Sequence, residues 1–136
     1  MTYSVIVFVT RKPGTTPEQF KHHYDNVHIP LIRGIAGPFF PLSHTRRYIY
    51  RSEGEAQDTT RNAATPAQVL LGSQADFDYD AIIEMTFSDA EAFQGFLGCL
   101  HGAENGPTVI GDEERFIDRA QFRAAILGTT ETTMRE

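Results

Sequence analysis

The residue of this chain best suited to proton transfer is His28, within the segment EQFKHHYDNVHIPLIRG. The apolar residues around it recur at helical spacing and predict one buried helix face, formed by Phe20, Tyr24, Val27 and Leu31. Because His28 follows Tyr24 by four residues, it lies on or beside that face. An imidazole with an ordinary pKa of about 6.5 exchanges protons at neutral pH, so the pattern predicts a general acid or base. The alternative is a histidine that caps the helix by bonding backbone carbonyls.

The helix that carries His28 has recognisable start and stop signals. Thr16 suits the N-cap and Pro17 the first helical position. Pro30 disfavours the helical conformation at the residue before it, so we expect the helix to end or kink just past His28. The predicted helix therefore spans residues 17–27, and a loop follows that is rich in breakers, namely Gly34, Gly37, Pro38 and Pro41.

Three alternating residues of a predicted strand are further polar candidates, namely His44, Arg46 and Tyr48. Side chains two positions apart in a strand share one face, which here is either the wall of a cavity or the helix side. An arginine in that place suits a carboxylate or phenolate, and a tyrosine can donate to a developing enolate. We predict that the three residues bind substrate; the alternative is an ion pair at the rim.

Asp80 and Glu84 share one face of another predicted strand, with Ile82 between them. A buried carboxylate has a raised pKa and can act as an acid or base, so Asp80 is a catalytic candidate and Glu84 a substrate-binding one. Ordinary ion pairs with arginines of the same or a second subunit are the simpler interpretation. Histidine and cysteine spacing matches no metal-binding motif such as HxH, HExxH or CxxC, so we expect no metal site.

The composition of the chain restricts the function classes. A length of 136 residues predicts a single domain with one core, and 12 basic against 18 acidic residues give a net charge of −6. That charge argues against nucleic acid or an acidic membrane surface as a partner. Cys99 is the only cysteine, which excludes an intrachain disulfide and favours a reducing, cytoplasmic setting. No apolar run approaches the roughly 20 residues of a membrane span.

Strand and helix patterns follow one another in the order strand, helix, strand, strand, helix, strand. Strand character marks residues 3–10, 44–51, 79–87 and 113–119, and helical character marks residues 17–27 and about 89–100. This order predicts an α+β fold, a ferredoxin-like βαββαβ sandwich with both helices on one face of an antiparallel sheet. The polar stretch 52–65 is interpreted as an insertion, and the residues from about 128 as a frayed tail.

The face of the predicted sheet that carries no helices also has apolar residues, and a ferredoxin-like sheet must cover such a face. A second sheet of the same kind would do so, which predicts a homodimer. The cavity between helix and sheet would then be apolar with a few polar groups, as in a small-molecule site. We include Phe8 and Ile82 among the residues that contact substrate.

The sequence resembles the EthD-like family of the dimeric α+β barrel superfamily. Three segments carry the resemblance in the expected order: RKPGTTPEQFKHHYDNVHIPL, FDYDAIIEMTFSDAEAFQGFL and DEERFID. The first is the most specific, and the phrases HTRRYIYR and FDYD are most similar to fungal members found in polyketide pathways. The long polar stretch 52–65 departs from the compact family pattern.

The resemblance implies a homodimer whose two sheets form a shared barrel. It also implies cofactor-free dehydration, decarboxylation or cyclisation of an aromatic or polyketide-type molecule, and it maps the histidine of the family's H-x-P segment onto His28. In this interpretation His28 shuttles a proton while Tyr24, Arg46 or Tyr48 and an acidic residue orient the substrate. The alternatives are a cofactor-free monooxygenase of anthrone type and a non-catalytic dimeric ligand-binding protein.

Overall fold

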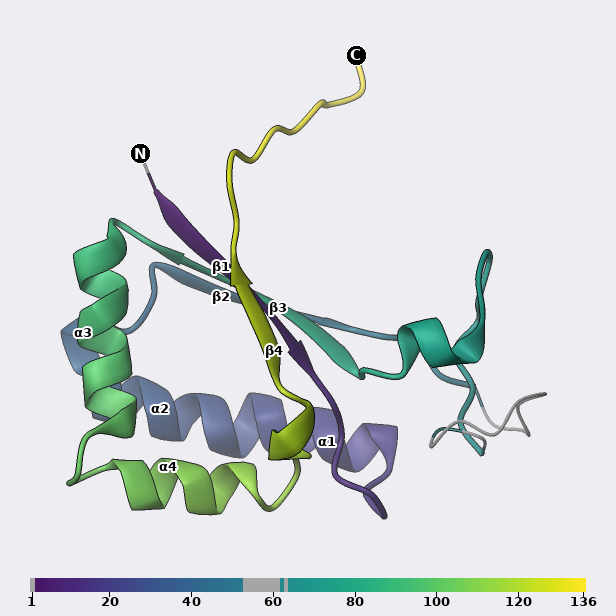
Figure 1. The fold of residues 1–136 in the computed structure, drawn as a ribbon, viewed down its shortest axis with the longest axis horizontal. Coiled ribbons are helices and arrows are strands. Elements are labelled where there is room, and N and C mark those ends of the chain that lie inside the picture. Colours follow the sequence, from purple (N-terminus) through teal and green to yellow (C-terminus); the bar gives the residue numbers. More distant parts are fainter. Residues whose placement is uncertain (1, 53–61, 63) are drawn as a thin grey trace.

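The computed structural model describes residues 2–52, 62 and 64–136. Within that part the strands form one antiparallel sheet in the order β2-β3-β1-β4, with β1 at Tyr3–Val9, β2 at Ser43–Tyr48, β3 at Ala81–Phe87 and β4 at Arg123–Ile126. Figure 1 shows helices α1 to α4 on one side of this sheet. The arrangement is the α+β, ferredoxin-like fold that the order of segments predicts.

Strand β3 shows how the sheet acquires a packed face and an open face. Its alternate residues Ala81, Ile83, Met85 and Phe87 are buried against the helical layer. The residues between them are half-buried on the opposite face, namely Ile82, Glu84 and Thr86. The predicted alternation of this strand is therefore confirmed.

The first helical segment of the chain begins as predicted and ends later than predicted. Thr16 caps α1 (Pro17–His23) in a reciprocal capping box with Gln19. The helix does not stop near Val27: it passes through a π-helical turn, η1 (Tyr24–His28), into α2 (Ile29–Ala36). The prediction that the helix ends at residue 27 was wrong, because the wider turn accommodates a proline that lacks an N–H, and Pro30 lies in the first turn of α2.

The π turn also changes which side chains face the core. The buried positions recur every four residues, at Phe20, Tyr24, His28, Ile32 and Ala36. In a regular helix of about 3.6 residues per turn, a strict four-residue spacing drifts around the axis, and a wider turn offsets that drift. Val27, predicted to be part of the apolar face, is 41% exposed instead.

The second helical segment of the chain contains two helices where we predicted one. Helix α3 (Ala90–His101) begins close to the predicted start at about residue 89, and the side chain of its N-cap Asp89 accepts from the Ala92 N–H. A second helix, α4 (Gly106–Glu113), lies in a segment for which we predicted no helix. The predicted fourth strand at 113–119 was wrong: the chain leaves α4 there and forms an isolated bridge between Ile117 and Arg11, and the fourth strand of the sheet is β4.

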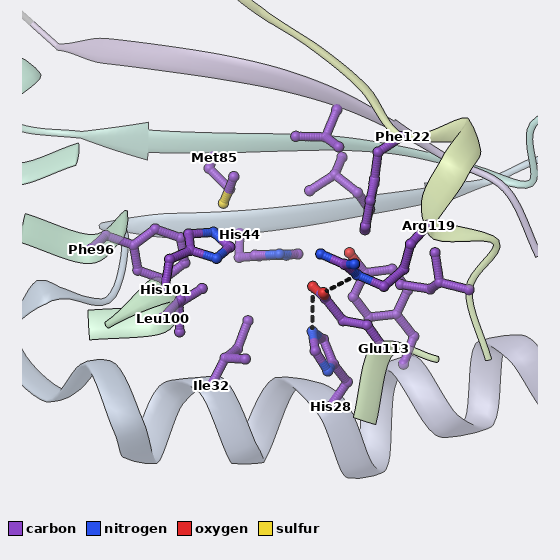
Figure 2. A pocket seen from close by; sticks show the side chains of 14 residues that line it. His28, Ile32, His44, Met85, Phe96, Leu100, His101, Glu113, Arg119 and Phe122 are labelled. Carbon is purple, nitrogen blue, oxygen red and sulfur yellow. Dashed lines mark hydrogen bonds and ion pairs between the residues drawn. The ribbon is translucent and has the colours of Figure 1, made fainter. Parts of the chain in front are cut away.

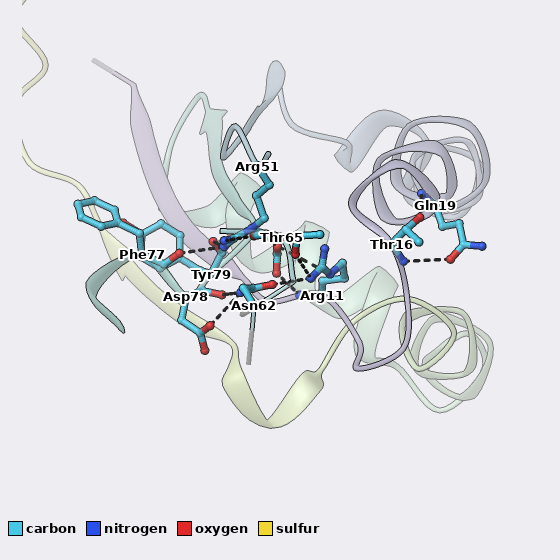
Figure 3. A network of polar contacts seen from close by, with 10 residues as sticks. Arg11, Thr16, Gln19, Arg51, Asn62, Thr65, Phe77, Asp78 and Tyr79 are labelled. Carbon is cyan, nitrogen blue, oxygen red and sulfur yellow. Dashed lines mark hydrogen bonds and ion pairs between the residues drawn. The ribbon is translucent and has the colours of Figure 1, made fainter. Parts of the chain in front are cut away.

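A buried polar network holds the base of the 52–65 segment to the sheet (Figure 3). Arg51, with a side chain only 1% exposed, donates to Asp80 Oδ1 at 2.8 Å and to the carbonyls of Phe77 and Tyr79. The backbone N–H of Arg11 donates to the other oxygen of Asp80, also at 2.8 Å. Most of the predicted insertion, residues 53–61 and 63, lies outside the described residues.

In the part that is described, no helix is long and apolar enough to cross a membrane.

Candidate functional site

A pocket of about 220 Å³ lies between the sheet and the helical layer (Figure 2). Its apolar wall comes from every layer of the fold, with Val7, Ile32, Ile83, Met85, Phe96, Leu100, Ile117 and Phe122. Its polar groups are His28, His44, His101, Glu113 and Arg119, together with the hydroxyl-bearing Tyr24. An apolar cavity with a few convergent polar groups is the usual form of a small-molecule site.

His28 is held at the floor of the pocket by Asp112 of α4. Its Nδ1 lies 2.8 Å from Asp112 Oδ2, and the imidazole is 4% exposed. Burial lowers the pKa of His28, and the hydrogen bond to Asp112 and the charge of Glu113 oppose that shift without cancelling it. The imidazole is therefore neutral at pH 7. Because a carboxylate only accepts, Nδ1 carries the proton and Nε2 presents a lone pair.

The lone pair of His28 Nε2 points toward Glu113, whose Oε2 is 3.9 Å away. Glu113 is itself paired with Arg119, whose Nε donates to Glu113 Oε1 at 3.0 Å. Figure 2 shows His28, Glu113, Arg119 and His44 directed at the middle of the pocket. Carboxylates on both sides of the ring stabilise an imidazolium, so His28 is a neutral base whose protonated form has two anionic neighbours.

Tyr24 separates the two pocket histidines. Its ring lies edge-on to both imidazoles, with centroids 5.7 Å from His28 and 6.1 Å from His44. Burial raises the pKa of Tyr24, and the nearby charge of Glu113 raises it further. The hydroxyl is therefore a hydrogen-bond donor at any physiological pH and not a phenolate.

His44 enters the pocket from β2 and is held by Arg46 on the same strand. Arg46 Nη1 lies 3.1 Å from His44 Nδ1, and Arg46 Nε donates to Asp25 Oδ1 at 2.8 Å. Burial lowers the pKa of His44 to about 4, with the positive charge of Arg46 as the next cause. His44 is consequently neutral near pH 7.

Tyr48 also donates to Asp25, at 2.5 Å. Tyr48 and Arg46 lie behind the pocket wall and are not among the residues that line the pocket.

Asp25 binds three donors at once, and these keep it ionised. Lys21 Nζ lies 2.7 Å from its Oδ2, while Arg46 and Tyr48 share Oδ1. Partial burial raises the pKa of this carboxyl, but the hydrogen bonds from Lys21, Tyr48 and Arg46 together lower it. The same arrangement raises the pKa of Tyr48, through burial first and then the hydrogen bond to Asp25.

Besides Arg46 and Tyr48, four more predicted site residues lie outside the pocket lining. Asp80 is 4% exposed and is bonded by Arg11 and Arg51. These contacts agree with the simpler interpretation of Asp80 as a member of ordinary ion pairs. Three others, Phe8, Ile82 and Glu84, lie on the open face of the sheet, where Phe8 pairs with Ile82 and Ile6 with Glu84. Strand alternation separates them from the pocket, because its strand residues, such as Val7, Ile83 and Met85, belong to the packed face.

Sequence reasoning missed two acidic residues at the end of α4, Asp112 and Glu113. From residue 113 the chain was interpreted as a strand, since helix propensity is weak around Gly106 and Gly111; Pro107 in the first turn of α4 is the local signal that fits a helix. His101 is the last residue of α3, and its exposed side chain lines the pocket. Within residues 2–52, 62 and 64–136, no group of three or more potential ligands is arranged to hold a metal ion.

Comparison with known proteins gives this pocket a family context. The EthD domain model matches residues 12–120. An ethyl tert-butyl ether D (EthD) family protein from Bacillus halodurans superposes with a TM-score of 0.57 at 18% identity, covering 96% of this chain and 100% of the other. A protein of Arabidopsis thaliana has a TM-score of 0.54 at 14% identity, with 97% and 99% covered. No curated protein matches the sequence.

We predict that acid destabilises the fold through His44. Its pKa is lower in the folded chain, about 4, than the ordinary 6.5. Below pH 6.5 the unfolded chain therefore binds more protons, and the free energy of unfolding decreases as the pH is lowered. With allowance for residual exposure of the ring, lowering the pH from 7 to 5 costs about 1–2 kcal/mol from this group. Denaturant unfolding of His44→Gln should therefore show a smaller acid loss than wild type. His22→Gln, on an exposed surface of α1, is the control; equal losses in wild type and His44→Gln would contradict the prediction.

Proposed function

The chain belongs to the EthD domain family, and from this membership and the pocket geometry we propose that it is a cofactor-free lyase or cyclase. The proposed substrate is a small aromatic or polyketide-type molecule with an acidic C–H or O–H next to a carbonyl or ring. The observation that carries the proposal is the Asp112–His28 hydrogen bond, which leaves Nε2 of a neutral imidazole unprotonated in a largely apolar pocket, 3.9 Å from Glu113.

The proposed chemistry is proton abstraction by His28 Nε2. Accepting a proton gives an imidazolium that keeps its Nδ1–H on Asp112 and has Glu113 3.9 Å from the new N–H. The same group returns the proton to another atom of the substrate, as dehydration, decarboxylation and cyclisation all require. Tyr24, fixed as a donor by its raised pKa, orients the substrate.

The dimensions of the pocket support a small substrate. At about 220 Å³ it is below the roughly 300–1,000 Å³ of sites for drug-sized ligands, so one ring or two fused rings suit it better than a larger system. Arg119, whose side chain is 35% exposed, suits a carboxylate at the mouth of the pocket.

The proposal includes a homodimer that covers the open face of the sheet. That face carries the half-buried apolar residues Ile6, Phe8 and Ile82. The apolar surface continues past the sheet, since the Phe8 ring is 4.7 Å from Tyr79 and the Tyr79 ring 6.5 Å from Phe77. A second copy burying this face would remove a contiguous apolar patch from water.

Deuterium exchange into 2-tetralone, a bicyclic ketone with acidic C–H bonds, tests the proton transfer without knowledge of the natural substrate. Wild-type protein in D₂O should accelerate the exchange, followed by NMR. His28→Ala should lower the rate by about 10²–10⁴-fold, because the base is lost. Asp112→Asn should give an intermediate rate, because the neutral amide supports the imidazolium less.

His22→Ala is the matched control, a histidine exposed on the same helical layer. It should exchange the ketone at the wild-type rate. A His28→Ala protein that retains its far-ultraviolet circular dichroism and its wild-type exchange rate would remove His28 from the mechanism.

Sedimentation velocity tests the dimer. Ile82→Glu places a charge at the centre of the open face, and we expect the protein to sediment as a monomer while wild type sediments as a dimer. Val27→Glu, a comparable change at an exposed position of the helical layer, should remain dimeric. A monomeric wild type would contradict the proposed dimer, and a dimeric Ile82→Glu would place its interface elsewhere.

A further inference from the structure

His28, which is buried, and His44, which is half-buried, are held as opposite tautomers. Asp112 accepts from His28 Nδ1, so the proton of that ring is on Nδ1 and its Nε2 is an acceptor. Arg46 lies 3.1 Å from His44 Nδ1 through Nη1, and a guanidinium only donates. His44 Nδ1 must therefore accept, and the proton of that ring is on Nε2.

Arg46 is kept in place by partners other than His44. Its Nε donates to Asp25 at 2.8 Å, and its Nη1 also reaches the His44 carbonyl at 3.4 Å. Asp25 is in turn bonded by Lys21 and Tyr48. The guanidinium therefore cannot turn away from the imidazole without breaking a network of charged hydrogen bonds.

The environment of His44 keeps it uncharged, which preserves this tautomer. Burial, the charge of Arg46 and a smaller contribution from His28 together lower its pKa to about 4. The ring stacks on Phe40, with centroids 6.2 Å apart and planes 17° apart, and contacts Tyr24 edge-on. In the described part of the chain, no hydrogen bond engages His44 Nε2, and His44 lines the pocket.

We propose that His44 is a second catalytic residue, whose Nε2–H donates a hydrogen bond to the oxygen on which negative charge develops when His28 removes a proton. Arg46 is its positioning residue. The inference rests on the proposed function of the pocket and adds to it the recognition of an enolate or phenolate oxygen.

The proposed proton transfer involves only the substrate and the two histidines. His28 Nε2 takes the proton from the acidic C–H or O–H, and the electron pair of the broken bond moves onto the oxygen as enolate or phenolate. That oxygen accepts from His44 Nε2–H, and the pair formed with the His28 imidazolium is neutral overall. A neutral donor suits this task because it stabilises the anion without protonating it. The substrate class is thus an enolisable ketone or a phenol.

Binding of 4-nitrophenol tests the donor directly, because the absorbance of its phenolate reports the ionisation state. At a pH below the pKa of the free phenol, wild-type protein should bind it in the phenolate form. His44→Phe keeps the ring and its stacking but removes the N–H, and should weaken phenolate binding by about 10- to 100-fold. His44→Gln retains a donor and should restore part of the affinity.

His22→Phe is the control, since His22 is exposed on α1 and lies outside the pocket lining. It should bind 4-nitrophenolate within about twofold of wild type. Equal weakening by His44→Phe and His22→Phe, or no saturable binding to wild type, would overturn the proposal. Failure of the ketone exchange with His44-dependent phenolate binding intact would instead count against the proton transfer alone.

The role of Arg46 is tested by the tautomer itself, read from the ¹⁵N shifts of His44. Wild type should show the Nε2–H form, and Arg46→Lys should retain it because the ammonium can donate to Nδ1. Arg46→Met should lose the fixed tautomer and weaken phenolate binding as His44→Phe does. A wild-type His44 protonated on Nδ1, or a tautomer unchanged in Arg46→Met, would contradict the assignment.

Discussion

The hydrogen bond between His28 and Asp112 is the interaction on which the site depends. It joins the π-helical turn η1, between α1 and α2, to the end of α4, 84 positions away in the chain. Asp112 also binds His23 Nε2 at 3.0 Å, so one carboxylate, itself only 8% exposed, is bonded by two histidines. A buried carboxylate is costly unless it is bonded, and these two donors offset that cost while they orient the imidazole.

The rest of the pocket is arranged around the direction of that imidazole. The π turn places His28 in line with Phe20, Tyr24 and Ile32, so the ring is at the core side of the helix and not at its surface. The sheet closes the pocket from the other side, and β2 brings in His44 with Arg46 behind it. The two histidines thus come from separate elements, and each is held by a partner outside the pocket lining, His28 by Asp112 and His44 by Arg46.

Local patterns predicted the elements that local rules control. The Thr16 cap, the alternation of β3 and the α3 cap at Asp89 all follow from residues close in sequence. His28, Tyr24 and His44, predicted as site residues, line the pocket. Asp80 was predicted to lie in the site because strand alternation cannot tell a carboxylate bound by Arg51 from a free one. Asp112 was missed because its importance comes from a contact across the fold, and helix propensity in a segment with Gly106, Pro107 and Gly111 is weak.

The most direct test of this account is the protonation state of His28, measured by ¹⁵N NMR of histidine-labelled protein across a pH titration. The account predicts a neutral ring at pH 7 with the proton on Nδ1 and a pKa below the ordinary value, since burial outweighs the two carboxylates. A ring that is already an imidazolium at pH 7, or a neutral ring with its proton on Nε2, would contradict the central claim that Asp112 holds His28 as a base facing the pocket.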